Sequence, residues 1–166
     1  MHRVLSLLFA AAMVMACART PAATPPPTPS PTPTPVPSGS FLTMAQAAAA
    51  YSKVAGPYND AIDAAQERYA VRTTLEEHQR YWARIAKADA AFIAGLKKIA
   101  FPPEVQADVA VLIKAEELFQ QHALATSHSR NAGEVLSFSA VANAAAEAAT
   151  AKAAKVREAL GLGPSV

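Results

Sequence analysis

The chain has 166 residues, of which 52% are hydrophobic and 17% are charged. Its 15 Lys and Arg residues nearly balance its 13 Asp and Glu residues, so the formal net charge is only +2. Nucleic-acid-binding domains are usually strongly basic, and we therefore expect no nucleic-acid partner.

The amino-terminal residues have the three parts of a secretory signal. A basic start at Arg3 precedes an apolar run over residues 4–15, and Cys17, the only cysteine, follows directly behind it. The run is shorter than the about 20 residues that a membrane-spanning helix needs. We therefore expect a cleaved signal peptide over residues 1–16 and no transmembrane anchor.

The segment Val14-Met15-Ala16-Cys17 resembles the lipobox of bacterial lipoproteins. That resemblance implies that the leader is cut before Cys17, that the Cys17 thiol carries diacylglycerol, and that the new amino terminus is acylated, commonly with palmitate. It implies a lipid-anchored, extracytoplasmic protein of the cell membrane. Since no Asp follows the cysteine, the resemblance implies the outer membrane in a host with two membranes. An ordinary secretory signal, cut at the small residues Ala10 and Ala12, is the alternative.

Residues 17–40 form the predicted linker behind the lipidated cysteine. Nine prolines alternate there with Thr and Ser, almost without charge. Such a segment has no apolar residues to bury, and it favours an extended polyproline II conformation. We expect a disordered spacer that holds the rest of the chain away from the bilayer.

From Phe41 onward, apolar residues recur at every third or fourth position, which predicts helices throughout. Residues at the expected ends have the chemistry of helix caps. Two capping boxes, an Asn cap and a Gly stop mark these ends: Thr43 with Gln46, Thr74 with Glu77, Asn131 and Gly161. The expected helices cover about 43–71, 74–100, 103–126 and 131–160. The first should continue as one kinked helix across Gly56-Pro57, because its apolar stripe stays in phase there.

Connections of only a few residues force consecutive helices to run antiparallel. We therefore predict an all-α fold, an antiparallel up-down four-helix bundle over residues 41–162 with a tail at 163–166. Its apolar faces should include Met44 on the first helix, Leu124 at the edge of the third and Phe138 on the fourth. The small side chains of the fourth helix should pack closely against the aromatic faces of the first two helices. The alternative is a three-helix bundle whose Ala-rich fourth helix docks loosely or swaps between chains.

Four polar residues lie on or beside the apolar stripes and are the candidates for site chemistry: His78, Asp89, Glu116 and His122. Asp89 and Glu116 fall at middle levels of the predicted bundle, where a bare carboxylate is costly unless it is paired, protonated or bound to a cation. One interpretation is a set of satisfied polar residues that fix the helix register. The other is a small internal metal or ligand site.

An aromatic stripe accompanies these polar residues and has two interpretations. Its members are Tyr51, Tyr58, Tyr69, Trp82, Phe92 and Phe119. At helical spacing, aromatic residues usually form a plain core. The alternative is a groove for an apolar ligand.

The motifs of common enzymes and cofactor sites do not occur in the sequence. No Glu-x-x-His pair, Cys-x-x-Cys, phosphate-binding glycine loop or nucleophile elbow is found. We therefore expect no cofactor and no catalysis. The stretch from Trp82 to Asp108, with Phe101-Pro102-Pro103-Glu104, is similar to uncharacterised helical lipoproteins of GC-rich bacteria, and this resemblance implies no activity.

These observations predict a membrane-tethered lipoprotein with a non-catalytic helical binding or structural module. Its expected partners are the membrane, through the lipid anchor, and an envelope protein or polymer. The alternative function is a metal- or small-ligand-binding bundle that uses the polar residues on the core stripe.

Overall fold

The computed structural model describes residues 41–163, in which four helices and no strands are found. Their bounds are α1 Met44–Arg68, α2 Leu75–Leu96, α3 Pro103–Ser127 and α4 Ala132–Ala159. The predicted leader, the predicted lipidation site Cys17 and the predicted linker lie outside the described residues, as do the last three residues of the tail. No helix among residues 41–163 combines the length and the apolarity needed to cross a bilayer.

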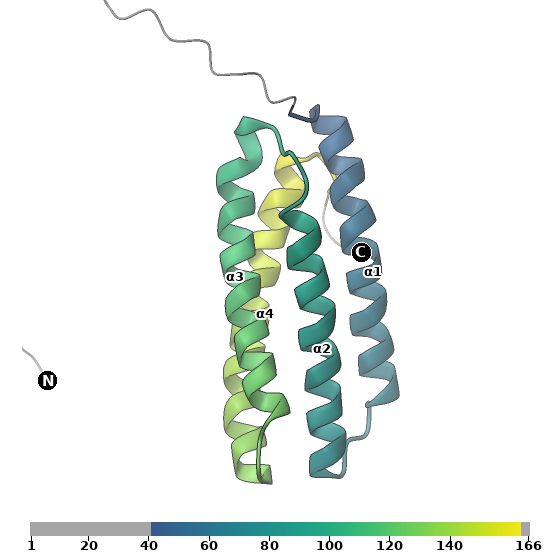
Figure 1. Ribbon diagram of the computed structural model, residues 1–166, viewed down its shortest axis with the longest axis vertical. Coiled ribbons are helices and arrows are strands. Elements are labelled where there is room, and N and C mark those ends of the chain that lie inside the picture. The colour runs from purple at the N-terminus through teal and green to yellow at the C-terminus, as the bar shows by residue number, and fades with distance from the viewer. Residues whose placement is uncertain (1–40, 164–166) are drawn as a thin grey trace, which may run out of the picture. The chain divides into compact units, whose positions relative to one another are not determined.

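The helices lie side by side, and consecutive helices run in opposite directions (Figure 1). α1 packs on α2, α2 packs on α3, and α3 packs most extensively on α4. The prediction of an all-α four-helix bundle is thus confirmed. The bundle is not evenly packed, however, since α1 and α4 do not form a comparable interface.

Three of the helices begin where the sequence predicts, and local hydrogen bonds cap each of these beginnings. At α1 the Gln46 amide donates to the Thr43 hydroxyl at 3.3 Å, and the Thr43 amide donates to the Gln46 side chain at 2.9 Å. The same reciprocal bonds join Thr74 and Glu77 at α2, at 3.2 and 3.0 Å. At α4 the Asn131 side chain accepts from the Glu134 amide. These bonds satisfy amide donors that have no partner within the helix.

Two helices end earlier than predicted. α1 ends at Arg68 instead of Val71, because Tyr69 leaves the helical conformation and its ring is buried against Tyr81 at a centroid distance of 6.2 Å. α2 ends at Leu96 instead of about residue 100. The next residues form tighter turns, with bonds from Lys98 and Ile99 to carbonyls three positions back.

α1 is one continuous helix across Pro57, as predicted. Its close approach to α2 depends on Gly95, because a Cβ at that position would overlap a methyl group of Val54. Glycine here allows the two helices to pack directly against each other.

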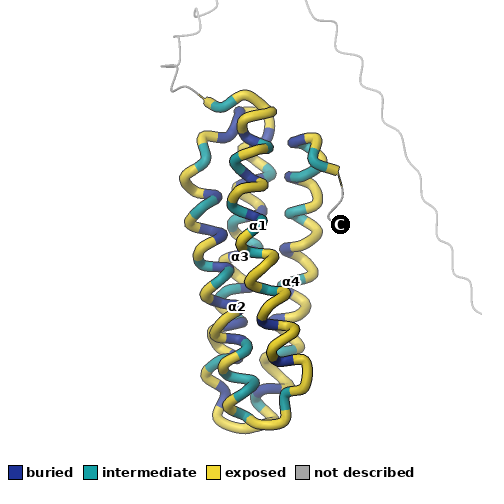
Figure 2. The backbone as a smooth tube through the Cα atoms, turned by 90° about the vertical axis from the view of Figure 1, so that its right-hand side faces the viewer, coloured by how far each residue is buried: buried dark blue, intermediate teal, exposed yellow. Residues whose placement is uncertain are grey.

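The apolar core consists of two clusters, and buried positions follow the inward faces of the helices (Figure 2). One cluster joins the beginning of α1, the end of α2, the beginning of α3 and the end of α4 around Tyr51, Phe92 and Leu112. The other surrounds Trp82 and Phe119. In sequence, Asp89 and Glu116 fall between the members of the two clusters on α2 and α3, at the middle level predicted for them.

Three residues predicted to lie on the apolar faces are exposed, and those predictions are wrong. Leu124, at the edge of the face of α3, is 44% exposed. Met44 and Phe138 are each 38% exposed. On α1, Ala47 takes the fully buried inward position instead of Met44. Phe138 has the phase of a core residue, but α4 packs mainly on α3, and this leaves part of its apolar stripe uncovered.

The prediction that α4 packs closely on α1 and α2 holds only in part. Ala142 and Ala145 join the Trp82 cluster, and Val156 and Leu160 join the Tyr51 cluster. Between these contacts, α4 lines an open groove that faces α1.

Candidate functional site

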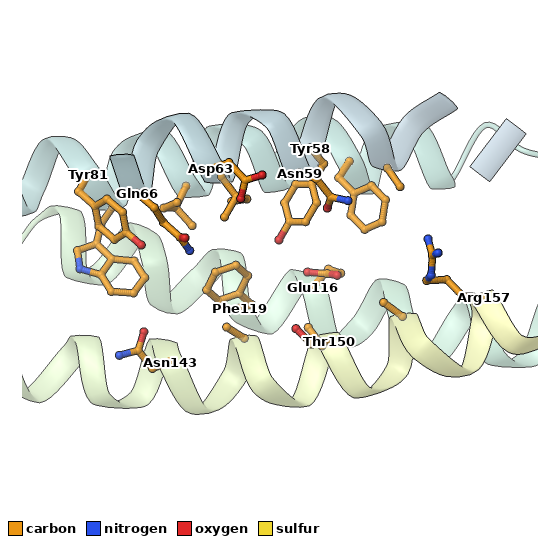
Figure 3. Close-up of a pocket in the computed structure, with 18 of the residues that line it drawn as sticks. Tyr58, Asn59, Asp63, Gln66, Tyr81, Glu116, Phe119, Asn143, Thr150 and Arg157 are labelled. Carbon is orange, nitrogen blue, oxygen red and sulfur yellow. The ribbon is translucent and has the colours of Figure 1, made fainter. Parts of the chain in front are cut away.

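The groove between α1 and α4 has a volume of about 410 Å³. This lies within the range of pockets that bind small molecules. Figure 3 shows its walls, with Tyr58, Asn59, Asp63 and Gln66 on the α1 side and Asn143 and Thr150 on α4. Glu116 and Phe119 rise from α3 between the walls.

Short side chains on α4 leave this space open. Where the groove passes along α4, its wall consists mainly of small residues, namely Ala146, Ala149, Thr150 and Ala153. Aromatic rings line the groove from the other helices: Tyr51, Tyr58, Tyr81, Trp82, Phe92 and Phe119. Five of the six rings in the predicted aromatic stripe line the groove, and most of them are also buried in the core. Tyr69 does not line it, and Tyr81, which the predicted stripe did not include, does.

Two carboxyl groups meet at the floor of the groove. Glu116 is 3% exposed and Asp89 is fully buried. Neither oxygen of Asp89, nor Oε2 of Glu116, receives a hydrogen bond from an N–H or hydroxyl group of the described residues. The two carboxyls lie close enough to affect each other's protonation, and a hydrogen bond between them requires that one of them be protonated.

Burial raises the pKa of both carboxyls above their usual values. For Asp89, the negative charge of Glu116 and the hydrogen bond to it raise the pKa further. For Glu116, the hydrogen bond from Asp89 acts in the opposite direction and lowers the pKa. We therefore expect the pair to hold a shared proton to a higher pH than two separate carboxyls would. Of the two side chains, Glu116 is the one that lines the groove.

Two tyrosines from α1 lie within the electrostatic field of this pair. Burial raises the pKa of Tyr51 to about 12, with Arg157 lowering it and Glu116 raising it. Burial also raises the pKa of Tyr58, and the charges of Glu116 and Asp89 add to that effect. Both hydroxyls therefore stay protonated and remain hydrogen-bond donors at neutral pH.

Packing holds these rings in place. The Tyr58 ring stacks on Phe92 at 4.7 Å and 16°, and the Tyr51 ring meets Phe92 edge-on at 6.2 Å. A ring fixed in this way loses little conformational entropy when a ligand binds against it.

The charge at one end of the groove belongs to Arg157. Its Nε donates to the Gly163 carbonyl at 3.1 Å, and its Nη2 donates to the Leu162 carbonyl at 3.4 Å. Arg157 thus ties the end of α4 to the residues that follow it. At the middle of the groove the charged lining residues are acidic, namely Glu116 and Asp63.

Of the four polar candidates from the sequence, the structure brings Asp89 and Glu116 together. His78, near the start of α2, and His122, in the last third of α3, are partly exposed and do not line the groove. Within residues 41–163, no three His, Cys, Asp or Glu side chains gather as metal ligands would.

Sequence reasoning missed several polar residues that line the groove. Asn59, Asp63 and Gln66 follow one another at helical spacing on α1, and Asn143 and Thr150 are seven residues apart in an Ala-rich stretch of α4. Both spacings place the residues on one face of a helix. This regular spacing of polar residues was the signal from which a polar helix face lining a groove could have been predicted.

The chain matches no protein-family model, and no curated protein or solved structure is significantly similar to it. The groove is therefore the basis for a functional assignment.

Proposed function

We propose that this protein is a membrane-tethered lipoprotein of the cell envelope whose helical bundle binds a small molecule, without catalysis, in the groove between α1 and α4. The observation that carries the proposal is the buried carboxyl pair at the groove floor. Buried polar atoms without hydrogen-bond donors are rare, and each requires an explanation. A ligand that supplies donors to Glu116 would provide one.

The composition of the lining supports the same proposal. Small-molecule sites are mostly apolar and aromatic, with a few polar groups that fix the orientation of the ligand. Here the rings of Tyr58, Trp82 and Phe119 supply the apolar surface, while Glu116 and Asn143 supply polar contacts. A structural role in fixing the register would explain a buried carboxyl pair, but it would not require an open groove above it.

Binding of a neutral fluorescent probe tests whether the groove accepts ligands. N-phenyl-1-naphthylamine is uncharged at neutral pH and brightens in apolar sites. Trp82 is the only tryptophan and lines the groove. Energy transfer from Trp82 to the probe therefore reports binding near this site. We expect saturable binding to the full-length protein.

A pair of alanine substitutions on α4 supplies the control. Ala146 lines the groove, whereas Ala148 is exposed and does not. Ala146→Phe should fill the groove and weaken probe binding at least about tenfold, a loss of about 1.4 kcal/mol. Ala148→Phe should leave the affinity unchanged. No saturable binding, or equal binding by both variants, would contradict a binding site in this groove.

A further inference from the structure

We propose that the ligand of the groove is an organic cation, an amine with an apolar ring body whose ammonium group binds to Glu116 between the rings of Tyr58 and Phe119. This proposal rests on the proposed function and names its ligand class. Its first support is the charge of the site. Glu116 and Asp63 line the groove with Asp89 behind them, while the single lining cation, Arg157, donates to the Leu162 and Gly163 carbonyls.

The burial of Glu116 explains why the site should prefer a cation to a neutral or anionic ligand. Placing a carboxylate in the protein interior is costly unless it is paired with opposite charge or hydrogen-bonded. An ammonium group supplies both, because it is positively charged and carries N–H donors for the Glu116 side chain that lines the groove. A neutral alcohol would supply a donor without charge, and an anion would be repelled by Glu116 and Asp63.

The aromatic walls suit the same ligand. A cation within about 6 Å of an aromatic ring face is attracted by the electrons of the ring, and the attraction grows when water is excluded. Tyr58 extends from α1 toward the floor, and Phe119 rises beside Glu116 from α3 (Figure 3). The adjoining surface at Trp82 and Ile85 would contact the apolar body of the amine.

The proton that the carboxyl pair shares provides a second way to detect the binding of a cation. The groups that interact electrostatically with the pair are Tyr51 and Tyr58 from α1 and, through Tyr51, Arg157 from α4. A bound cation favours the ionised pair over the protonated pair, because it replaces the proton as the positive charge beside the carboxylates. Binding of a permanently charged cation should therefore release a proton from the protein, and its affinity should rise with pH.

Three probes of similar shape test the proposal on the full-length protein: phenethylamine, phenethyl alcohol and 3-phenylpropionate. Trp82 fluorescence measures the binding of each. We expect the amine to bind at least about tenfold more tightly than the alcohol, and the anion to bind most weakly. Glu116→Gln should remove the advantage of the amine and keep the affinity for the alcohol. The matched control Glu147→Gln, an exposed residue of α4 outside the groove, should keep the advantage.

Calorimetry with phenyltrimethylammonium provides a test on the wild-type protein that does not depend on the folding of any variant. This ion has no titratable proton, so any proton released comes from the protein. The apparent binding enthalpy should vary with the ionisation enthalpy of the buffer. An enthalpy independent of the buffer would overturn the role of the carboxyl pair.

The failure of this proposal differs from the failure of the proposed function. If the amine, the alcohol and the anion bind equally, or if the anion binds best, the ligand is not a cation, but the groove remains a binding site. If these probes and N-phenyl-1-naphthylamine all fail to bind, the proposed function itself is wrong.

Discussion

At the scale of single residues, Asp89 is the position at which the demands of burial and of charge conflict most. Its side chain is fully buried, and the neighbouring charged group that raises its pKa is another acid, Glu116. A buried acid pair is stable as long as it retains a proton, and it becomes costly when that proton leaves. The bundle should therefore lose stability when a rise in pH removes that proton from the pair.

We expect the wild-type protein to lose stability as pH rises. Both carboxyls of the pair, Asp89 and Glu116, have raised pKa values in the folded state. Their contribution to stability is fully present below the unfolded pKa values, near about 4. It declines as pH rises through the raised folded values. Urea unfolding at a series of pH values from about 5 to about 8 measures this decline.

Asp89→Asn should reduce that pH dependence. The amide has nearly the same shape, donates to Glu116 and carries no charge, so the variant should exceed the wild type in stability by about 1–2 kcal/mol at pH about 8. The control Asp60→Asn, at an exposed position of α1, should follow the wild type. A wild-type stability that is constant or increases over this pH range would show that the carboxyls are not buried as described.

At this scale the sequence singled out Asp89 and Glu116 as buried candidates but predicted neither their contact nor their surroundings. Asp89 and Glu116 were found because acids on an apolar stripe break a strong pattern. Their contact follows from the meeting of α2 and α3 at the middle of the bundle. The sequence did not show that Asn143 and Thr150 line the groove. Polar residues on an Ala-rich helix fit a solvent-exposed face equally well.

At the scale of the helices, beginnings were predicted better than ends. Thr43, Thr74 and Asn131 each bond to an amide within the next three residues, so these caps are encoded locally. The end of α1 depends instead on the burial of Tyr69 against Tyr81, which lies on another helix. Tertiary contacts of this kind have no local signal.

The contact of α1 with α2 allows a direct test of helix spacing. A Cβ at position 95 would overlap a methyl of Val54, and Val has little rotamer freedom in a helix. Gly95→Ala should therefore destabilise the protein by about 1–3 kcal/mol, although alanine favours helix formation by up to about 1 kcal/mol. Thermal or urea unfolding measures the change.

The double variant Gly95→Ala with Val54→Ala supplies the control for this steric explanation. Removing the methyl groups of Val54 should recover most of the lost stability, so the two substitutions should show a favourable coupling energy. If Gly95→Ala alone stabilises the protein, or if the two effects simply add, the close approach of α1 and α2 at this position is incorrect.

At the scale of the whole molecule, the sequence predicted the number and order of helices but not the opening between α1 and α4. Apolar periodicity shows which face of a helix is buried, and it does not show which neighbours cover that face. The fourth helix carries small side chains that fit equally well against any neighbour. Its preference for α3 over α1 is a property of the assembled bundle, and the groove follows from it.

The last prediction concerns how the whole protein is held at the membrane. The predicted leader ends at Cys17 in a segment that resembles a lipobox, and the helices of residues 41–163 supply no membrane span. If the anchor is lipid on Cys17, the wild-type protein should incorporate labelled palmitate and sediment with membranes. Cys17→Ser should lose both the label and the membrane association, because a serine hydroxyl cannot form the thioether.

Ligand binding supplies the control for this substitution. The groove lies within the described bundle, far along the chain from Cys17, so Cys17→Ser protein should bind N-phenyl-1-naphthylamine as the wild type does. Two or more acyl chains give stable anchoring, whereas a single chain gives only marginal binding. The wild type should therefore remain on membranes after a high-salt wash. A wild-type protein that carries no label and washes off the membrane would mean that the leader is an ordinary secretory signal and that the bundle works untethered.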